Sequence, residues 1–246
     1  MEYFWPIFGL AMLSGSVTLI GVLLALWLGQ DDAFVSAGLG FSVGIMLLLA
    51  CFELLPAAFE AKSVLSGSLW AAAGAGFLAL ANALIPHTHL IDESDPLKAH
   101  RLKAAYLVLF GLILHDFPEG FALTHSFVLD ANLGLMAAVS IALHNIPEEF
   151  AIAVPALSTK SHRVLFGGAV VSALAEPAGA LLGLLAIQVR PDLNAVFLAL
   201  AAGAMIFVSL HELVPAARQY GRVGLFSVGL ALSAIIYSIL AILITG

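Results

Sequence analysis

The stretch GIMLLLACFELLPAA, residues 44–58, recurs as GAMIFVSLHELVPAA at residues 203–217, and the two copies align without a gap. Each copy lies in a long apolar run and carries a glutamate three residues before a proline. The two runs are the second and seventh of eight, so they should cross a membrane in opposite directions. An inverted repeat of this kind predicts a substrate site near the membrane midplane, where the two repeats meet.

The composition places the chain in a membrane. Of its 246 residues, 62% are hydrophobic and only 10% are charged, whereas soluble domains carry about 25% charged residues. One cysteine excludes a disulfide scaffold, and nine Lys and Arg in a chain of net charge −7 exclude a nucleic-acid-binding surface. We predict an all-α integral membrane protein whose outer surface contacts lipid.

Eight apolar runs are long enough to cross a bilayer, which takes about 20 helical residues. They cover residues 4–28, 34–59, 65–86, 104–128, 131–157, 164–189, 194–217 and 223–245.

The connections between these runs leave no room for a separate soluble domain. We expect residues 1–246 to form one transmembrane transporter domain. Residues 1–86 form the first repeat and residues 164–246 the inverted repeat, so spans one to three oppose spans six to eight. The fourth and fifth spans, residues 104–157, lie between the repeats, and residues 87–103 form a polar loop.

Basic residues predict the orientation, because Lys and Arg near helix ends stay on the cytoplasmic side. With the N-terminus outside, only Lys62 and Arg190 face outward. The cytoplasmic connections then hold Lys98, Arg101, Lys103, Lys160, Arg163, Arg218 and Arg222. We therefore predict a multi-pass protein of the cell (inner) membrane with both termini extracytoplasmic.

Seven acidic residues lie inside the expected spans: Glu53, Asp116, Glu119, Glu148, Glu149, Glu176 and Glu212. An ionised carboxylate at the bilayer centre costs roughly 2.5–3.5 kcal/mol even on lenient insertion scales. Bound cations or protons must offset this cost, because no Lys or Arg lies deep in the spans. The first option predicts a metal pathway and the second a proton pathway.

Two neighbouring spans share one motif, LHDFPEGFAL from Leu114 and LHNIPEEFAI from Leu143. Each places an imidazole and a carboxylate four residues apart on one helix face: His115 with Glu119, and His144 with Glu148. Mixed nitrogen and oxygen ligands suit Zn²⁺, Fe²⁺ or Mn²⁺ better than Ca²⁺ or Mg²⁺. The motif pair therefore favours a transition-metal site.

Prolines and further polar residues extend this pattern. Asp116 and Asn145 follow the two histidines and offer oxygen ligands. Each motif also contains a proline, which interrupts the helix and exposes a carbonyl, as helices do beside membrane ion sites. Glu176, which precedes Pro177, repeats the combination on the sixth span and is a candidate ligand from a third helix.

With these motifs the chain resembles the ZIP family of divalent metal transporters, in particular bacterial members of broad metal range. The resemblance covers essentially the whole chain and implies a binuclear site midway across the membrane. It assigns the first ion to His115, Glu119, His144 and Glu148, with Met46 nearby. It assigns the second ion to Asp116, Glu119, Asn145, Glu148 and Glu176, the two shared glutamates bridging. Asp116 departs from the family's usual Asn, and Glu149 from its usual Gly, and both departures bear on metal preference.

Several other residues are open to two interpretations. Glu149, Glu53, His211 and Glu212 are candidates for a gate or an ion pathway, and the last three could equally face water near helix ends. His87, His89 and His100 could accept an ion in the cytoplasmic loop or be ordinary loop residues.

We predict transport of a divalent ion, Zn²⁺ or else Fe²⁺, Mn²⁺ or Cd²⁺, into the cytoplasm without ATP. No enzyme activity is expected, and no cofactor other than the transported ion. One alternative is a metal-free proton pathway. A second is an intramembrane metallohydrolase, although its H-E-x-x-H signature fails because HELVP at His211 ends in Pro215. A homodimer is one option for the assembly.

Overall fold

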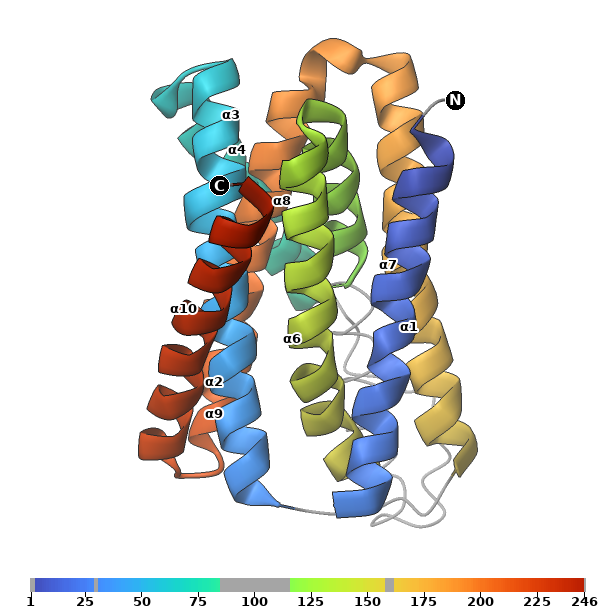
Figure 1. The fold of residues 1–246 in the computed structure, drawn as a ribbon, viewed down its shortest axis with the longest axis vertical. Helices are drawn as coiled ribbons and strands as arrows, with labels where there is room; N and C mark the ends of the chain where they lie inside the picture. The colour runs from blue at the N-terminus through green and yellow to red at the C-terminus, as the bar shows by residue number, and fades with distance from the viewer. Residues whose placement is uncertain (1–2, 29–30, 85–115, 158–161, 246) are drawn as a thin grey trace.

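The computed structural model describes residues 3–28, 31–84, 116–157 and 162–245. Across these ranges the chain folds into helices joined by short connections, and no strand occurs in them (Figure 1). The elements are α1 (Phe4–Leu28), α2 (Asp32–Leu49), η1 (Ala50–Leu54), α3 (Leu55–Ala61), α4 (Val64–Leu84), the helical segment 116–129, α6 (Ala131–Leu157), α7 (His162–Val189), η2 (Pro191–Leu193), α8 (Asn194–Val208), η3 (Ser209–Leu213), α9 (Val214–Arg218) and α10 (Val223–Thr245).

The helices confirm an all-α, multi-pass membrane protein. Within the described ranges, six helical stretches are long and apolar enough to cross a bilayer. They are Phe4–Leu28, Asp32–Ala61, Val64–Ala81, Leu165–Val189, Pro191–Arg218 and Val223–Ile244. The 27 residues of α6 also exceed the length of a span, and the segment 116–129 is the described part of the expected fourth span.

The sequence repeat reappears in the backbone. The π-helical turn η1 begins at Ala50 and η3 begins at Ser209, the aligned positions of the two copies. A proline follows each turn, and its ring would collide with the carbonyl four residues back in a regular α-helix. In the wider turn η1, the N–H of Leu55 donates to the carbonyl of Ala50 five residues earlier, so the hydrogen-bond register is already shifted by one residue just before Pro56.

The two copies run in opposite directions. In Figure 1, α2 leads up to α3 whereas α8 leads down to α9. α2 packs against α10 and α8 packs against α4, contacts that the repeat relates to one another. Glycine permits both approaches, because a Cβ at Gly40 would collide with the carbonyl of Phe226, and one at Gly74 with that of Leu200.

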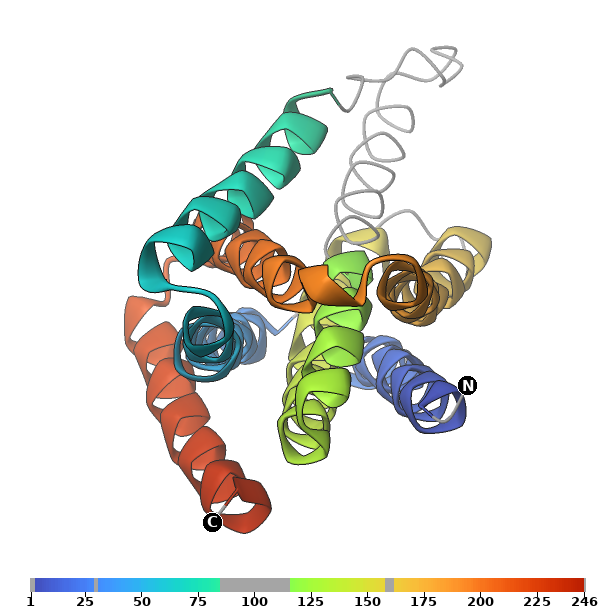
Figure 2. The same cartoon turned by 90° about the horizontal axis from the view of Figure 1, so that it is seen from above.

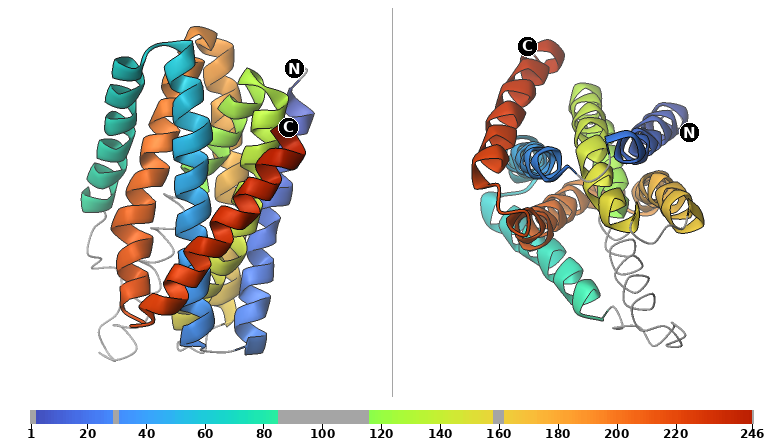
Figure 3. Two further views of the ribbon diagram at one scale, coloured as in Figure 1. Left: turned by 60° about the vertical axis from the view of Figure 1, so that its left-hand side comes forward. Right: turned by 90° about the horizontal axis from the view of Figure 1, so that it is seen from below.

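A second group of helices holds the polar interior. α1 packs against both α6 and α7, and α6 also contacts α2. Figure 2 shows α1 and α7 on one side, α2, α4 and α10 on the other, and the segment 116–129 and α6 between them. Both marked termini lie toward the same end of the bundle (Figures 1 and 3). The centre of the molecule therefore lies between the group α1, α6 and α7 and the helix α2.

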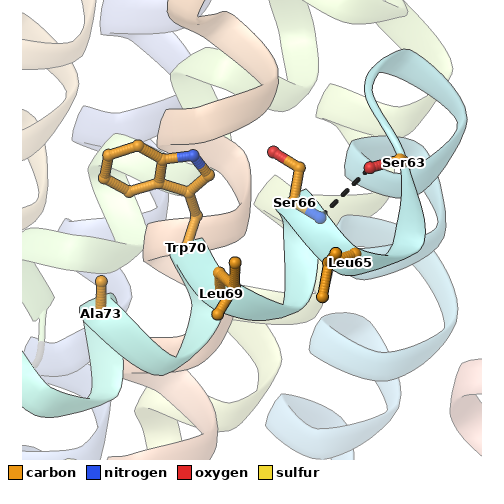
Figure 4. Close-up of a pocket in the computed structure, with 6 residues that line it drawn as sticks. All are labelled: Ser63, Leu65, Ser66, Leu69, Trp70 and Ala73. Atoms are coloured by element: carbon orange, nitrogen blue, oxygen red, sulfur yellow. Dashed lines mark hydrogen bonds between the residues drawn. The ribbon is translucent and has the colours of Figure 1, made fainter.

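The outer faces are apolar and the interior carries charge, the reverse of a soluble domain. Trp27 and Leu243, for example, are 81% and 75% exposed, as expected for side chains that face lipid. A shallow groove on α4, lined mainly by Leu65, Leu69 and Trp70, belongs to this outer surface (Figure 4). The polar residues considered next lie elsewhere, on the segment 116–129, α6 and α7.

Candidate metal site

The predicted ligands lie in the interior, most of them where the segment 116–129, α6 and α7 meet. Those that the structure describes are at most 4% exposed: Asp116, Glu119, His144, Asn145, Glu148, Glu176 and Met46. His115, the remaining predicted ligand, lies outside the described residues. The interior therefore concentrates carboxyl groups far from bulk water.

No basic side chain offsets this charge within the described part of the chain. Its Lys and Arg residues with described side chains, Lys62, Arg190, Arg218 and Arg222, are all exposed. Arg190 pairs with Asp192 at the surface, with 2.8 Å between the guanidinium nitrogen and the carboxylate oxygen. Protons, metal ions or paired charges stabilise buried carboxylates in a membrane interior.

His144 is held in an orientation that suits a metal ligand. Its Nδ1 lies 2.9 Å from the carbonyl oxygen of Ser140, which can only accept a hydrogen bond, so Nδ1 carries the proton. Its Nε2 then points at Glu119, 2.9 Å from Oε1. A proton must lie between these two atoms, and a metal ion can take its place by binding both.

A second polar contact links α6 to α7. The amide of Asn145 donates to Oε2 of Glu176 at 3.3 Å. Ser14 of α1, which is buried, is a polar neighbour of the same carboxyl group. Polar side chains of two other helices, α1 and α6, therefore surround the Glu176 carboxyl group.

A serine joins the two acidic departures from the ZIP pattern. The Ser172 hydroxyl on α7 lies 2.6 Å from Oδ2 of Asp116 and 3.3 Å from Oε2 of Glu149. Glu149 is 4% exposed. It therefore lies in the interior beside the predicted second-ion ligands and does not face bulk solvent.

Met46 enters the core from α2. Its sulfur lies 3.6 Å from Oγ of Ser209. α2 also contacts α6, because Ser42 donates to the backbone carbonyl of His144 at 2.9 Å. A role for Met46 as a soft ligand remains a prediction.

The described donors do not form a preassembled metal cage. Among residues 3–28, 31–84, 116–157 and 162–245, no group of three His, Cys, Asp or Glu side chains is arranged to hold an ion. The side chains instead pair with one another, Glu119 with His144 and Glu176 with Asn145. An ion would have to replace these pairwise contacts.

Comparison with known proteins identifies the family. A model of the ZIP zinc transporter family matches residues 85–245. The chain belongs to the ZIP zinc transporter family. The resemblance inferred from the motifs is thereby confirmed, and the family's members are transporters, not enzymes.

Curated relatives of this ZIP protein match along most of its length. The zinc transporter ZupT of Corynebacterium glutamicum is 34% identical over 238 residues, 87% of this chain and 90% of the relative. The protein of the same name from Corynebacterium aurimucosum is 35% identical, covering 87% and 88%. That of Escherichia coli is 36% identical, covering 85% of this chain and 86% of the relative.

The candidate gate residues of this ZIP protein lie on the two π-helical turns. Glu53 belongs to η1, which precedes α3, and His211 and Glu212 belong to η3, which precedes α9. In Figure 1, α3 and α9 lie toward opposite ends of the bundle. Tyr237 of α10 donates to Oε1 of Glu53 at 2.7 Å. The His211 ring is exposed and stacks on Phe207, with the ring centroids 4.8 Å apart.

Sequence reasoning missed the hydroxyl groups around the site. Ser172 precedes Glu176 by one helical turn, so the helical period could have placed it on the same face. Ser14 and Ser140 carry no such signal, because their roles depend on contacts with other helices or on a backbone carbonyl.

Proposed function

We propose that this ZIP protein carries Zn²⁺ and related divalent ions, among them Fe²⁺, Mn²⁺ and Cd²⁺, across the membrane into the cytoplasm. The observation that carries the proposal is the buried contact between His144 and Glu119, set among further carboxyl groups with no basic side chain described beside them. The relatives named as zinc transporters support Zn²⁺ as the first substrate to test.

The transported ions occupy a binuclear site in this proposal. His115, Glu119, His144 and Glu148 hold the first ion, with Met46 nearby. Asp116, Asn145 and Glu176 hold the second, and the two motif glutamates bridge the ions. The burial of every described member of this set supports the assignment.

Alternating access about the midplane moves the ion, with residues 1–86 and 164–246 as inverted repeats of one transporter domain. Opposite directions of α2 and α8 support this organisation (Figure 1). A divalent ion entering a negative interior gains roughly 2.3 kcal/mol per charge for each 100 mV, so ATP is not required.

Both termini are proposed to lie outside the cytoplasm, in the cell (inner) membrane. The termini lie toward one end of the bundle (Figure 1). Lys62 and Arg190 occupy connections at that end, whereas Arg218 and Arg222 flank the connection after α9. The excess of basic residues expected in the remaining connections supports the orientation.

Uptake into proteoliposomes tests the proposal. Purified protein should move Zn²⁺ inward, and a panel with Fe²⁺, Mn²⁺ and Cd²⁺ should rank the substrates. Glu119→Ala and Glu148→Ala should each abolish uptake without loss of folded protein, whereas Glu60→Ala, which removes an exposed acid of α3, should not. Normal uptake by both site variants would refute the assignment.

A metal-free proton pathway is the second candidate, because the contact between His144 and Glu119 already holds a proton. Equilibrium binding of Zn²⁺ to purified protein separates the two functions. Binding supports the metal pathway, and proton flux without any metal binding supports the alternative.

A further inference from the structure

Ser172 bridges two carboxyl groups from different helices. It lies on α7, Asp116 lies on the segment 116–129, and Glu149 lies on α6. All three side chains are buried, with exposed fractions of 1%, 4% and 4%. Three separate helical segments thus meet at one hydroxyl group.

A hydroxyl group has a single proton, so Ser172 can donate to only one carboxylate at a time. The contact with Asp116, at 2.6 Å, is in the range of hydrogen bonds from a hydroxyl to a charged oxygen. The contact with Glu149 is 0.7 Å longer, at 3.3 Å compared with 2.6 Å. Asp116 therefore takes the proton of Ser172, and Glu149 is a more distant neighbour of the hydroxyl.

This bond differs from the usual behaviour of serine in a helix. Serines commonly donate to the carbonyl of their own preceding turn, as do Ser209, Ser227 and Ser238 here. Ser172 donates across to another segment instead. A buried hydroxyl that leaves its own helix restrains the partner it reaches.

We propose that Ser172 is a positioning residue that sets the metal preference of the transporter by holding the Asp116 carboxylate. The role rests on the proposed function, in which Asp116 is a ligand of the second ion. A carboxylate restrained before the ion arrives binds more tightly, because less freedom is lost on binding. Loss of such an outer partner typically lowers metal affinity about 10- to 100-fold.

The metal preference follows from the ligand chemistry of Asp116, which offers a charged oxygen. Ions that favour carboxylate oxygen, such as Mn²⁺, depend on a firmly held Asp116 more than Cd²⁺ does.

Metal binding to the purified full-length protein tests the role. Ser172→Ala should weaken Mn²⁺ binding about tenfold and Cd²⁺ binding less, whereas Ser172→Thr, which keeps the hydroxyl, should restore the wild-type ranking. Ser233→Ala is a matched control, because it removes a buried hydroxyl of α10 that bonds only within its own helix.

A double-mutant cycle distinguishes positioning from a general packing effect. In an Asp116→Ala background, the loss caused by Ser172→Ala should disappear. In a Glu149→Ala background it should persist or grow, since Asp116 is then the sole acceptor of the pair. An equal loss in the Asp116→Ala background would overturn the role, and a loss that vanishes with Glu149→Ala would assign the hydroxyl to Glu149.

Failure of this role can be told apart from failure of the proposed function. Metal binding that Ser172→Ala leaves unchanged would overturn the role alone. Absence of any divalent-ion binding by the wild-type protein would overturn the proposed function and the role of Ser172 together.

Discussion

At the scale of single residues, the site depends on backbone and hydroxyl groups as much as on the ligands themselves. The Ser140 carbonyl fixes which nitrogen of His144 faces Glu119, and Ser172 restrains Asp116. The motif spacing predicts His144, Asn145 and their glutamate neighbours as buried polar residues. It cannot predict the partners of these side chains, because the partners come from other helices.

Metal affinity should fall as the pH falls. Zn²⁺ must displace the proton held between His144 and Glu119, so protons and metal compete for the same atoms. We expect up to about a tenfold loss of affinity for each pH unit and each displaced proton. Titration calorimetry with Zn²⁺ between pH 7.5 and 5.5 measures this change in affinity. A constant affinity across the range would exclude His144 as a ligand.

Asp116→Asn should shift the preference toward softer ions. The change restores the amide usual in the family and removes a hard, charged oxygen from the second position. The apparent KM for Mn²⁺ should rise, and Cd²⁺ should gain relative to Mn²⁺ in the uptake panel. If both the KM and the ranking stay as in the wild type, Asp116 lies outside the coordination shell.

At the scale of helices, small residues set how closely the spans approach. Gly74 of α4 meets the backbone of Leu200, and Gly40 of α2 meets that of Phe226. The two contacts belong to helix pairs that the repeat relates, α4 with α8 and α2 with α10. Close backbone approach stabilises helix association in membranes, where lipid removes most of the hydrophobic driving force.

Gly74→Ala should therefore destabilise the protein. The added methyl group collides with the Leu200 carbonyl, and overpacking of this kind costs about 1–3 kcal/mol. Gly76→Ala is the control, because it lies on the same helix and a Cβ there would meet nothing within 4 Å. Thermal unfolding in detergent should separate the two variants, and equal midpoints would contradict the packing argument.

Helix ends could be predicted closely from the sequence, whereas local helix geometry could not. The predicted spans 4–28, 131–157 and 223–245 match α1, α6 and α10 to the residue, since charges, Gly or Pro bound each run. The sequence does not predict the π-helical turns, because a helix can also accommodate a proline through a kink or a break. Their positions within the aligned copies nonetheless agree with the repeat.

At the scale of the whole molecule, the two copies of the repeat are alike in backbone but not in partners. The alignment that pairs Glu53 with Glu212 also pairs Tyr237 of α10 with Leu78 of α4. Tyr237 donates a hydrogen bond to Glu53, whereas Leu78 is an apolar core residue that is 2% exposed. A bond from this position to the π-turn glutamate can therefore form in one copy and not in the other.

Tyr237→Leu makes the two copies alike at this position. A net hydrogen bond contributes about 1 kcal/mol, so its loss should change the ratio of outward-open to inward-open protein about fivefold. Hydrogen–deuterium exchange of α3 and α9, which lie toward opposite ends of the bundle, should report the change. Exchange identical to the wild type in both helices would show that the bond does not distinguish the two states.

The asymmetry has a consequence for the resting state of the transporter. If the two repeats were identical, exchanging their conformations would convert the outward-open state into the inward-open state without a change in free energy. Both states would then be equally populated. Any imbalance must then come from positions where the copies differ, such as Tyr237 and Leu78. In the proposed alternating-access cycle, the waiting orientation of the empty protein thus depends on the positions where the copies differ, and a substitution at such a pair should shift it while the fold stays the same.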